Sequence, residues 1–454
     1  MTGVTAMPPA GRPVGLETIR PCLEGVIPVG IATISADGTP NVTYLSQVHY
    51  VDNGHVALSY QFFNKTRRNL LANGQALLQL IDPVTAATWR IAVAHERTET
   101  EGPLFESMRA KLAGIASHTG MDGVFRLLGA DICRVVAIEA VPGDSLPDRR
   151  ATVDFLPPLR SLAHMLARAG DLSDAMERLT AGLHERLGFT HTAVLLHDPG
   201  NDTLYTVASR GYETSGIGAE LPMGAGVIGT AARTRTAIRI THMTSDVAYA
   251  RLSGGESGLA ALGQAIPMPG LADPGSQLAV PIEDGCGLLG ILFVESPADL
   301  AFTYDHEDAL AVIAAQLAPI VRRGMADAPD LPEAQPRPVR PSGRPIDIRY
   351  FRANDSVFID DDYLIKGVAG AIFWILAQAF ANEGRSAFSN RELRVHPALH
   401  LPAYSENLEA RLHLLERRLA EKAAGIALER TGRGRFRLRV DRPLRLVDMA
   451  CAPA

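Results

Sequence analysis

The sequence predicts an α+β multidomain protein, and three features of the chain support this. Its length of 454 residues is typical of two to four domains. Two proline-rich stretches, 141–158 and 325–345, interrupt it, and the second contains six prolines, as expected of an extended, semi-rigid linker. The three blocks that remain, about 15–142, 159–323 and 346–447, each combine strand-like alternation with helix-like periodicity.

The composition is that of an ordinary soluble protein, with 46% hydrophobic and 21% charged residues. No apolar run is long enough to span a bilayer, and the N-terminus resembles neither a secretory signal nor a basic transit peptide. Cys22, Cys133, Cys286 and Cys451 stand far apart without a CxxC pair, which disfavours a structural metal site or a disulfide framework. We therefore expect a cytoplasmic protein that is not associated with a membrane.

The first block is rich in strands. Residues 29–48 alternate apolar and small polar side chains on both sides of an Asp-Gly turn, which predicts a hairpin. Further strands are expected at 55–61, 75–82, 89–102 and 131–143, with helices at 64–74 and 104–120. Many strands and two helices in about 130 residues fit a small barrel.

Three cations stand at the start of the first predicted helix, in the stretch QFFNKTRRNLLANG. Lys65, Arg67 and Arg68 follow an apolar strand directly. A helix start presents unpaired N–H groups and a partial positive charge, cations add to both, and Thr66 can cap the helix or donate to a phosphate oxygen. The stretch is either a solvated helix start or an anion site, and we favour the anion site.

The first block resembles the pyridoxamine 5′-phosphate oxidase-like FMN-binding split barrel. The segments GIATISADGTPNVTYLSQV and HVALSYQFFNKTRRNLLANGQALLQLID carry the resemblance. It implies a homodimer with FMN between the subunits, and the turn at 64–70 as the phosphate site. The Arg-Leu-x-Pro element that the oxidase uses for its substrate is not found, so oxidation of vitamin B6 itself is not expected. The implied cofactor-binding residues are Ser46, Gln47, Ser59, Asn64, Lys65, Thr66 and Arg67.

The second block begins with a predicted long amphipathic helix at 158–188. Strands at 191–198 and 203–211, a Gly-rich turn with a helix and strand over 222–240, and a hairpin at 276–296 follow. With the closing helix at 302–323, this order resembles a GAF domain, an α/β sandwich with an antiparallel sheet. The resemblance implies sensing of a small molecule or light, with an unknown ligand. The Gly-rich segment 250–275 is either a lid over a ligand pocket or a tolerated insertion.

The third block is predicted to hold short strands, an apolar helix at 368–384 and a helix start capped by Ser389 with Glu392 three residues later. A periodic helix at 405–423 and a hairpin at 426–440 complete it. From Arg385 to Arg445 there are 14 Lys and Arg against 7 Asp and Glu, a net of +7, so the rest of the chain carries −13. Such a basic segment indicates either a nucleic-acid-facing surface or a solvated basic face.

This order of elements resembles the winged-helix DNA-binding domain of response regulators. The segments FSNRELR, NLEARLHLLERRL and TGRGRFRLRV carry the resemblance. It implies that the third helix enters the major groove of double-stranded DNA and that the wing reaches the backbone. The alternative is an interaction module in which the arginines pair with glutamates at helical spacing. The implied DNA-binding residues are Arg411, Arg417, Arg418, Lys422, Arg433 and Arg435.

Two functions of different classes fit this organisation. In the first, a flavin-type barrel and a GAF domain sense redox state or a small ligand, and a winged helix provides a DNA-binding output. In the second, the chain is an FMN-dependent oxidoreductase with two regulatory domains. Because flavin itself carries the hydride chemistry, few catalytic side chains are needed and none is assigned. A scaffold with empty pockets is the third alternative.

Overall fold

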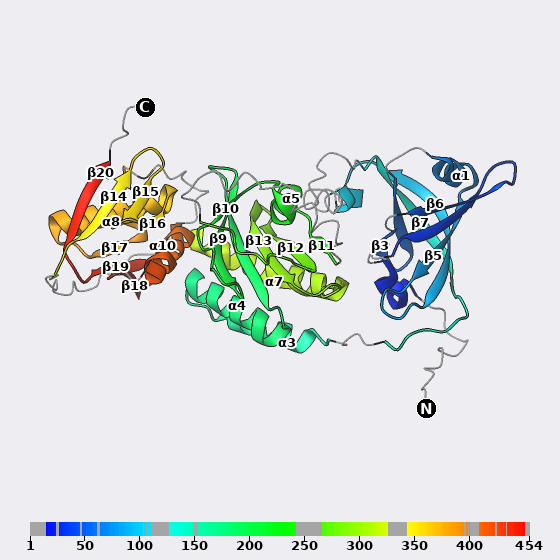
Figure 1. Cartoon of the computed structure of the whole chain (residues 1–454), viewed down its shortest axis with the longest axis horizontal. Coiled ribbons are helices and arrows are strands. Elements are labelled where there is room, and N and C mark those ends of the chain that lie inside the picture. Colours follow the sequence, from blue (N-terminus) through cyan, green and yellow to red (C-terminus); the bar gives the residue numbers. More distant parts are fainter. Residues whose placement is uncertain are drawn as a thin grey trace.

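The computed structural model describes residues 15–449 except 24–26, 46–47, 61–63, 103, 106, 110–126, 149–152, 242–265, 326–342, 395, 398, 400–407, 423–424 and 433. Three parts follow one another in a row in sequence order (Figure 1). Within the described residues, no helix is both long enough and apolar enough to cross a membrane.

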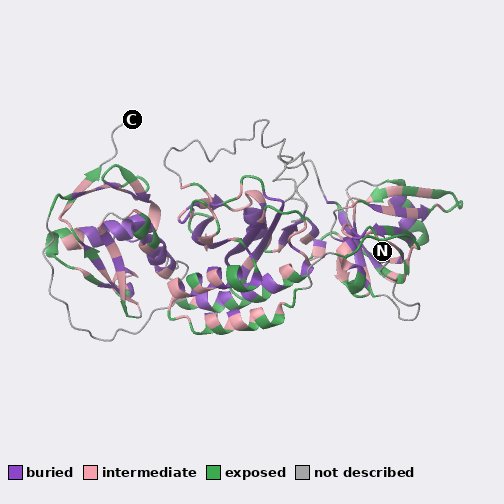
Figure 2. Cartoon of the chain, turned by 60° about the horizontal axis from the view of Figure 1, so that its bottom comes forward, coloured by how far each residue is buried: buried purple, intermediate pink, exposed green. Residues whose placement is uncertain are grey.

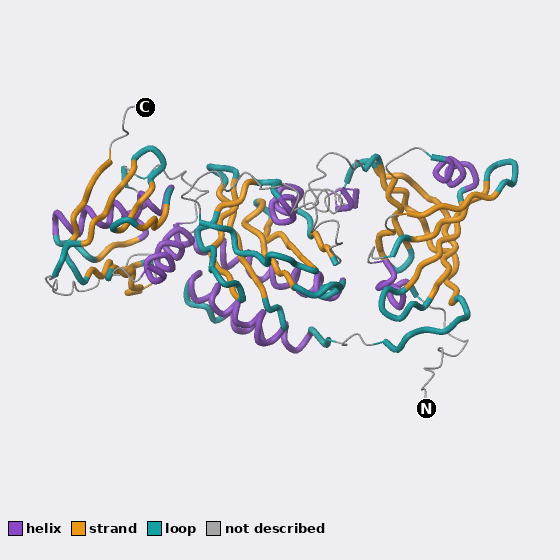
Figure 3. The backbone as a smooth tube through the Cα atoms, viewed as in Figure 1, coloured by secondary structure: helices purple, strands orange, loops and turns teal. Residues whose placement is uncertain are grey.

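The first part is a seven-stranded antiparallel sheet in the order β2-β1-β5-β6-β7-β4-β3, and it curls into a barrel (Figure 3). The expected hairpin is confirmed, since Gly38 takes a left-handed φ of 83° in the turn between its strands. The stretch after this turn is not one strand but two, which lie at opposite edges of the sheet. The strands are β1 Val29–Ile34, β2 Pro40–Leu45, β3 Val48–Asp52, β4 His55–Tyr60, β5 Gln75–Ile81, β6 Thr88–Glu99 and β7 Gly129–Ala140.

Two short helices complete the barrel. The 3-10 helix η1, Leu16–Leu23, inserts the buried side chains of Leu16, Ile19 and Leu23 among the apolar residues of the barrel core. Helix α1, Lys65–Asn73, follows β4 and ends at Gly74, whose left-handed φ of 67° lets its N–H close the last turn onto Leu70. Most of the helix predicted at 104–120 lies outside the described residues.

The second part is a six-stranded antiparallel sheet in the order β10-β9-β8-β13-β12-β11, with largely buried strands (Figure 2). Apolar residues of α3, α4 and α7 pack against one face, and those of α5 pack against the other. The bounds are α3 Leu156–Ala167, α4 Leu172–Leu187, β8 His191–Asp198, β9 Thr203–Arg210, β10 Glu220–Pro222, α5 Gly226–Thr234, β11 Ile238–Ile240, β12 Ser276–Asp284, β13 Gly287–Ser296 and α7 Tyr304–Met325.

The single helix predicted at 158–188 is wrong, because the chain breaks it between α3 and α4. Asp171 stands in extended conformation after Gly170, and its carboxylate accepts the Asp174 N–H at 2.9 Å. A capped helix start at this point is more favourable than a continuous helix through Gly and Asp, both of which have poor helix propensity.

The third part has a four-stranded sheet, β16-β15-β14-β20, and a three-stranded sheet, β17-β19-β18. The cap of Ser389 on the Glu392 N–H is confirmed at 3.3 Å. One strand was not expected: β20 pairs in parallel with β14 and forms an edge of the four-stranded sheet. The elements are β14 Ile346–Phe351, β15 Ser356–Ile359, β16 Asp362–Ile365, α8 Gly367–Glu383, β17 Ala387–Ser389, α9 Asn390–Arg394, α10 Leu408–Lys422, β18 Ile426–Gly432, β19 Arg435–Val440 and β20 Leu444–Met449.

The contacts between the parts differ in character. Between the barrel and the second part, the Arg20 guanidinium lies 4.2 Å from the ring centre of Tyr304 and 3.5 Å from the Asp308 carboxylate. Between the second and third parts, by contrast, buried apolar residues form one continuous cluster. The third part is therefore joined to the second through a shared core.

Candidate functional site

The expected cofactor site begins where β4 leads into α1. The side chain of Asn64 accepts the Arg67 N–H at 3.0 Å, so Asn64 is the N-cap of α1, not Thr66. Lys65 and Arg68 are exposed, and no ion pair joins either of them to the described residues. This helix start therefore presents two solvated cations and a partial positive charge to an incoming anion.

A buried polar network fixes α1 against the β1–β2 hairpin. Asn41 Nδ2 donates to Thr66 Oγ1 at 2.9 Å, and Asn69 Nδ2 donates to Thr33 Oγ1 at 3.2 Å. Thr66, Asn69 and Thr33 are all buried. Thr66 thus has a structural role in positioning the helix, in addition to any role toward a ligand.

Arg67 points into the barrel wall. Its Nε lies 3.1 Å from Asp131 Oδ2, and its guanidinium carbon lies 3.7 Å from the ring centre of Tyr60. Thr98 Oγ1 also donates to Asp131, at 2.6 Å, and His95 Nε2 lies 3.7 Å from the same carboxylate. The positive charge of Arg67 is therefore neutralised by a buried aspartate, which leaves less of it for a phosphate.

The structure gathers five of the seven expected cofactor-binding residues at this junction. Four are in the cap and first turn of α1, and the fifth, Ser59, is half-buried near the end of β4 and opposite Ala130 of β7. Ser46 and Gln47 lie outside the described residues. Sequence reasoning missed Asp131, although an aspartate within the apolar strand GADICRVV is a signal for a buried, paired carboxylate.

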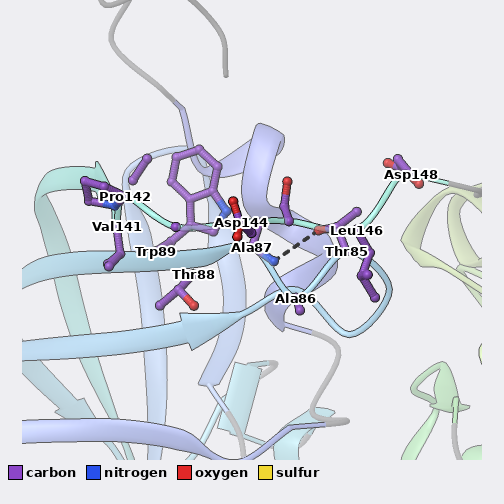
Figure 4. Close-up of a pocket in the computed structure, with 13 residues that line it drawn as sticks. Thr85, Ala86, Ala87, Thr88, Trp89, Val141, Pro142, Asp144, Leu146 and Asp148 are labelled. Atoms are coloured by element: carbon purple, nitrogen blue, oxygen red, sulfur yellow. Dashed lines mark hydrogen bonds between the residues drawn. The ribbon is translucent and has the colours of Figure 1, made fainter. Parts of the chain in front are cut away.

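A separate hollow of about 250 Å³ opens at the other end of β5 (Figure 4). It lies between the β5–β6 turn and the chain that leaves β7, and its lining includes Trp89, Asp144 and Leu146. The seven residues of β5 separate it from α1 by roughly 20 Å. This hollow is thus distinct from the cationic turn.

The second part holds a buried carboxyl group on the sheet face that α5 covers. Glu295 is 2% exposed, accepts the Leu271 N–H at 2.7 Å and accepts Gln277 Nε2 at 3.1 Å. Burial raises the pKa of this carboxyl, while the hydrogen bonds from Gln277 and Leu271 act in the opposite direction. Of the Gly-rich segment 250–275, which was expected to be either a lid or an insertion, residues 250–265 lie outside the described residues.

The cations expected to face DNA differ in how far the structure exposes them. Arg411 and Arg418 of α10 are buried, whereas Arg417 is exposed. Lys422 is partly exposed, with its Nζ 4.0 Å from the Asp362 carboxylate. Of the two wing residues, Arg435 is half-buried at the start of β19, and Arg433 lies outside the described residues.

Comparison with family models agrees with this architecture. Residues 16–134 match the family described as pyridoxamine 5′-phosphate oxidase, and residues 169–322 match the GAF domain. The chain therefore carries a pyridoxamine 5′-phosphate oxidase-like split-barrel domain followed by a GAF domain. Neither match extends past residue 322, so neither includes the block after the linker. A search of curated proteins finds no match.

Solved structures resemble single parts of the chain. A GAF domain of an Acinetobacter phosphoenolpyruvate-protein phosphotransferase is 17% identical, covers 38% of this chain and 96% of its own, and has a TM-score of 0.31. HupZ of Group A Streptococcus is 21% identical over 29% of this chain and 98% of its own, with a TM-score of 0.23. An FMN-binding protein of Syntrophomonas wolfei is 17% identical over 28% and 92%, with a TM-score of 0.23.

Proposed function

We propose that the chain is a flavin-dependent sensor whose barrel binds FMN and whose third part is a DNA-binding output. A split barrel of a flavin-binding family joined to a GAF domain fits a sensor. The observation that carries the FMN assignment is the solvated cationic start of α1, at the turn where the family resemblance expects a phosphate. Bound FMN would supply reversible two-electron redox chemistry.

The residues present fit a phosphate in part. Lys65 would hold it as a point charge, together with the N–H groups of the first turn of α1. Arg67 is committed to Asp131, so less of its charge is left for a phosphate than the sequence implied, whereas Thr66 only accepts from Asn41 and keeps its own hydroxyl proton. Lys65 is thus the best residue on which to test the site.

The test is an FMN titration of the purified protein, followed by the visible spectrum. Lys65→Ala should weaken FMN binding roughly tenfold or more, because it removes a charge-assisted contact. Arg90→Ala is the matched control. Arg90 is an exposed cation on β6 of the same barrel, but it pairs with Gln79, near the end of β5 that is distant from α1. Equal affinity in both variants, or no binding of FMN by the wild type, would refute the assignment. NAD(P)H-dependent turnover by the flavin-loaded protein would instead favour the oxidoreductase.

The barrel is proposed to form a homodimer. One row of small and apolar residues crosses five paired strands on the outer face: Val42, Ala32, Leu77, Ala92 and Ala137. Val42 is 74% exposed and the neighbouring Tyr44 is 78% exposed, so the row is unusually apolar for a solvated surface.

Light scattering coupled to size exclusion tests the homodimer. Leu77→Lys places a charge in the centre of the row and should give a monomer. Leu71→Lys is the matched control, because Leu71 is equally exposed at 42% but lies on α1, outside the row. A dimer that survives Leu77→Lys unchanged would contradict the proposed interface.

The DNA-binding output rests on the arrangement of the third part. Helices α8, α9 and α10 precede the β18–β19 hairpin, and this region carries the net charge of +7 between Arg385 and Arg445. A basic hairpin beside a helix is a common way to reach phosphates and a groove. Binding to duplex DNA that weakens steeply with salt would support this output.

A further inference from the structure

Part of the α10 surface expected to contact DNA packs against the GAF domain: Arg411 and Arg418 are buried, whereas Arg417 is exposed. Arg411, Leu414, Arg418 and Glu421 recur at three- and four-residue spacing and so share one side of the helix. Leu414 and Arg418 lie against Gly218, in the turn between β9 and β10 of the GAF domain. We call these four residues the docked face of α10.

A buried ion pair anchors the docked face. Arg411 Nη2 donates to Asp198 Oδ2, and the side chains are only 7% and 6% exposed. The guanidinium carbon of Arg411 lies 3.9 Å from the ring centre of Tyr205 on β9. Because Asp198 also accepts the Gly200 N–H and Asn201 Nδ2, each at 3.0 Å, the carboxylate is held rigidly at the end of β8.

Polar contacts continue around the edge of the docked face. Ser215 Oγ donates to Glu421 Oε1, and Arg418 Nε donates to the Leu364 carbonyl oxygen at 3.0 Å. Outside α10, Lys366 Nζ lies 2.8 Å from Glu220 Oε2 and ties the start of α8 to β10. The Ser215–Glu421 and Lys366–Glu220 contacts join the third part to the GAF domain, whereas the Arg418 bond to Leu364 of β16 lies within the third part. The docked face is thus covered by the GAF domain and is not open to a second macromolecule.

We propose that docking of α10 on the GAF domain and binding of duplex DNA exclude each other, so that the protein does not bind DNA in the arrangement described here. The inference rests on the proposed DNA-binding output. A helix enters the major groove only with its contacting face free, and here Asp198 of the GAF domain holds the Arg411 guanidinium while Gly218 lies against Leu414 and Arg418. Duplex binding therefore requires α10 to leave the GAF domain.

Asp198→Asn tests the exclusion without altering the DNA-facing residues. The substitution leaves Arg411 buried without a full counter-charge in the docked arrangement, whereas Arg411 is hydrated once α10 is released. The released population should rise, and the Kd for a fluorescein-labelled duplex of random sequence should fall by about tenfold or more. Asp202→Asn is the matched control, because Asp202 is in the same β8–β9 turn but its side chain is 82% exposed.

Two measurements on the full chain separate the possible failures. Hydrogen exchange of residues 408–422 reports release, and fluorescence anisotropy of the duplex reports binding. Faster exchange with tighter binding in Asp198→Asn, and neither in the control, is the expected result. Unchanged exchange would show that the Arg411–Asp198 ion pair does not hold α10 on the GAF domain. If the wild type already binds the duplex and Asp198→Asn releases α10 without binding it more tightly, docking and DNA binding do not exclude each other.

Release with no duplex binding in any variant would instead refute the DNA-binding output itself, and the exclusion with it. Ser215→Glu is a second variant in case Asp198→Asn disturbs the β8–β9 turn. It sets a carboxylate against Glu421 at the partly exposed edge of the docked face and should release α10 by like-charge repulsion. Exchange in the strands of the GAF sheet should stay unchanged in both variants.

Discussion

Replacing Asp131 by Asn removes the charge that neutralises Arg67 while keeping the shape of the side chain. The side chains of Asp131 and Arg67 are 3% and 13% exposed, so the pair is almost fully removed from water. Breaking such a pair from one side typically costs 3–5 kcal/mol, and we expect about 3 kcal/mol because Arg67 keeps its contact with Tyr60. The free energy of unfolding of the barrel should fall by this amount.

Urea unfolding followed by tryptophan fluorescence measures this change. Trp89 is in the barrel and Trp374 is in α8, so a Trp374→Phe background makes the signal specific to the barrel. Arg134→Gln is the control on the same strand as Asp131. Its ion pair with Glu96 is between side chains 53% and 36% exposed and should contribute less than about 1 kcal/mol. If Asp131→Asn costs no more than this control, the reasoning from burial is wrong.

Three further outcomes follow from burial and close contacts. Burial lowers the pKa of His413 from 6.5 to about 4, so the unfolded chain takes up a proton at a higher pH than the folded chain does. About 2 kcal/mol of stability should therefore be lost as the pH falls from 7 to 5. In guanidinium unfolding a His413→Gln variant should lack this loss, and an equal loss in the variant would contradict the assignment. Gly370→Ala would put a Cβ 1.9 Å from the Asp355 carbonyl oxygen and should cost about 2 kcal/mol or more in thermal unfolding; a neutral effect would be inconsistent with that packing. The exposed Cys286 should react with a thiol reagent at once, whereas burial raises the pKa of Cys133 to about 12 and should keep it unreactive until unfolding, and the reverse order would refute this.

Local patterns allowed much of the fold to be predicted. The Asp-Gly turn before β2, the Ser389 cap and the periodic helix that forms α10 each depend on residues within a few positions of one another, and all are found in the structure. The break between α3 and α4 was missed because helical periodicity continues across it, although Gly170 and Asp171 carried the signal. Strand β20 was missed since its partner β14 lies about a hundred residues away and parallel pairing leaves no local trace.

The candidate sites were harder to predict than the fold for a related physical reason. An arginine near a helix start has the same local sequence whether it meets a phosphate, a groove or a buried carboxylate. Arg67 meets Asp131, 64 residues away, and Arg411 meets Asp198, 213 residues away. Sequence identifies the cations and their spacing, but only the tertiary fold decides which of them are neutralised within the chain and which remain for a ligand.

The ion pair between Arg411 and Asp198 makes the junction between the GAF domain and the third part more reversible than its apolar core implies. Burial of Leu414 against Gly218 favours docking. Burial of two charges opposes it, because each ion loses hydration that the pair only partly restores. Release of α10 exposes apolar surface, which is unfavourable, but it also rehydrates both ions, which offsets part of that cost. Strand β9 contributes to both faces of the GAF sheet, since Leu204 packs in the core under α5 and Tyr205 contacts Arg411 of α10.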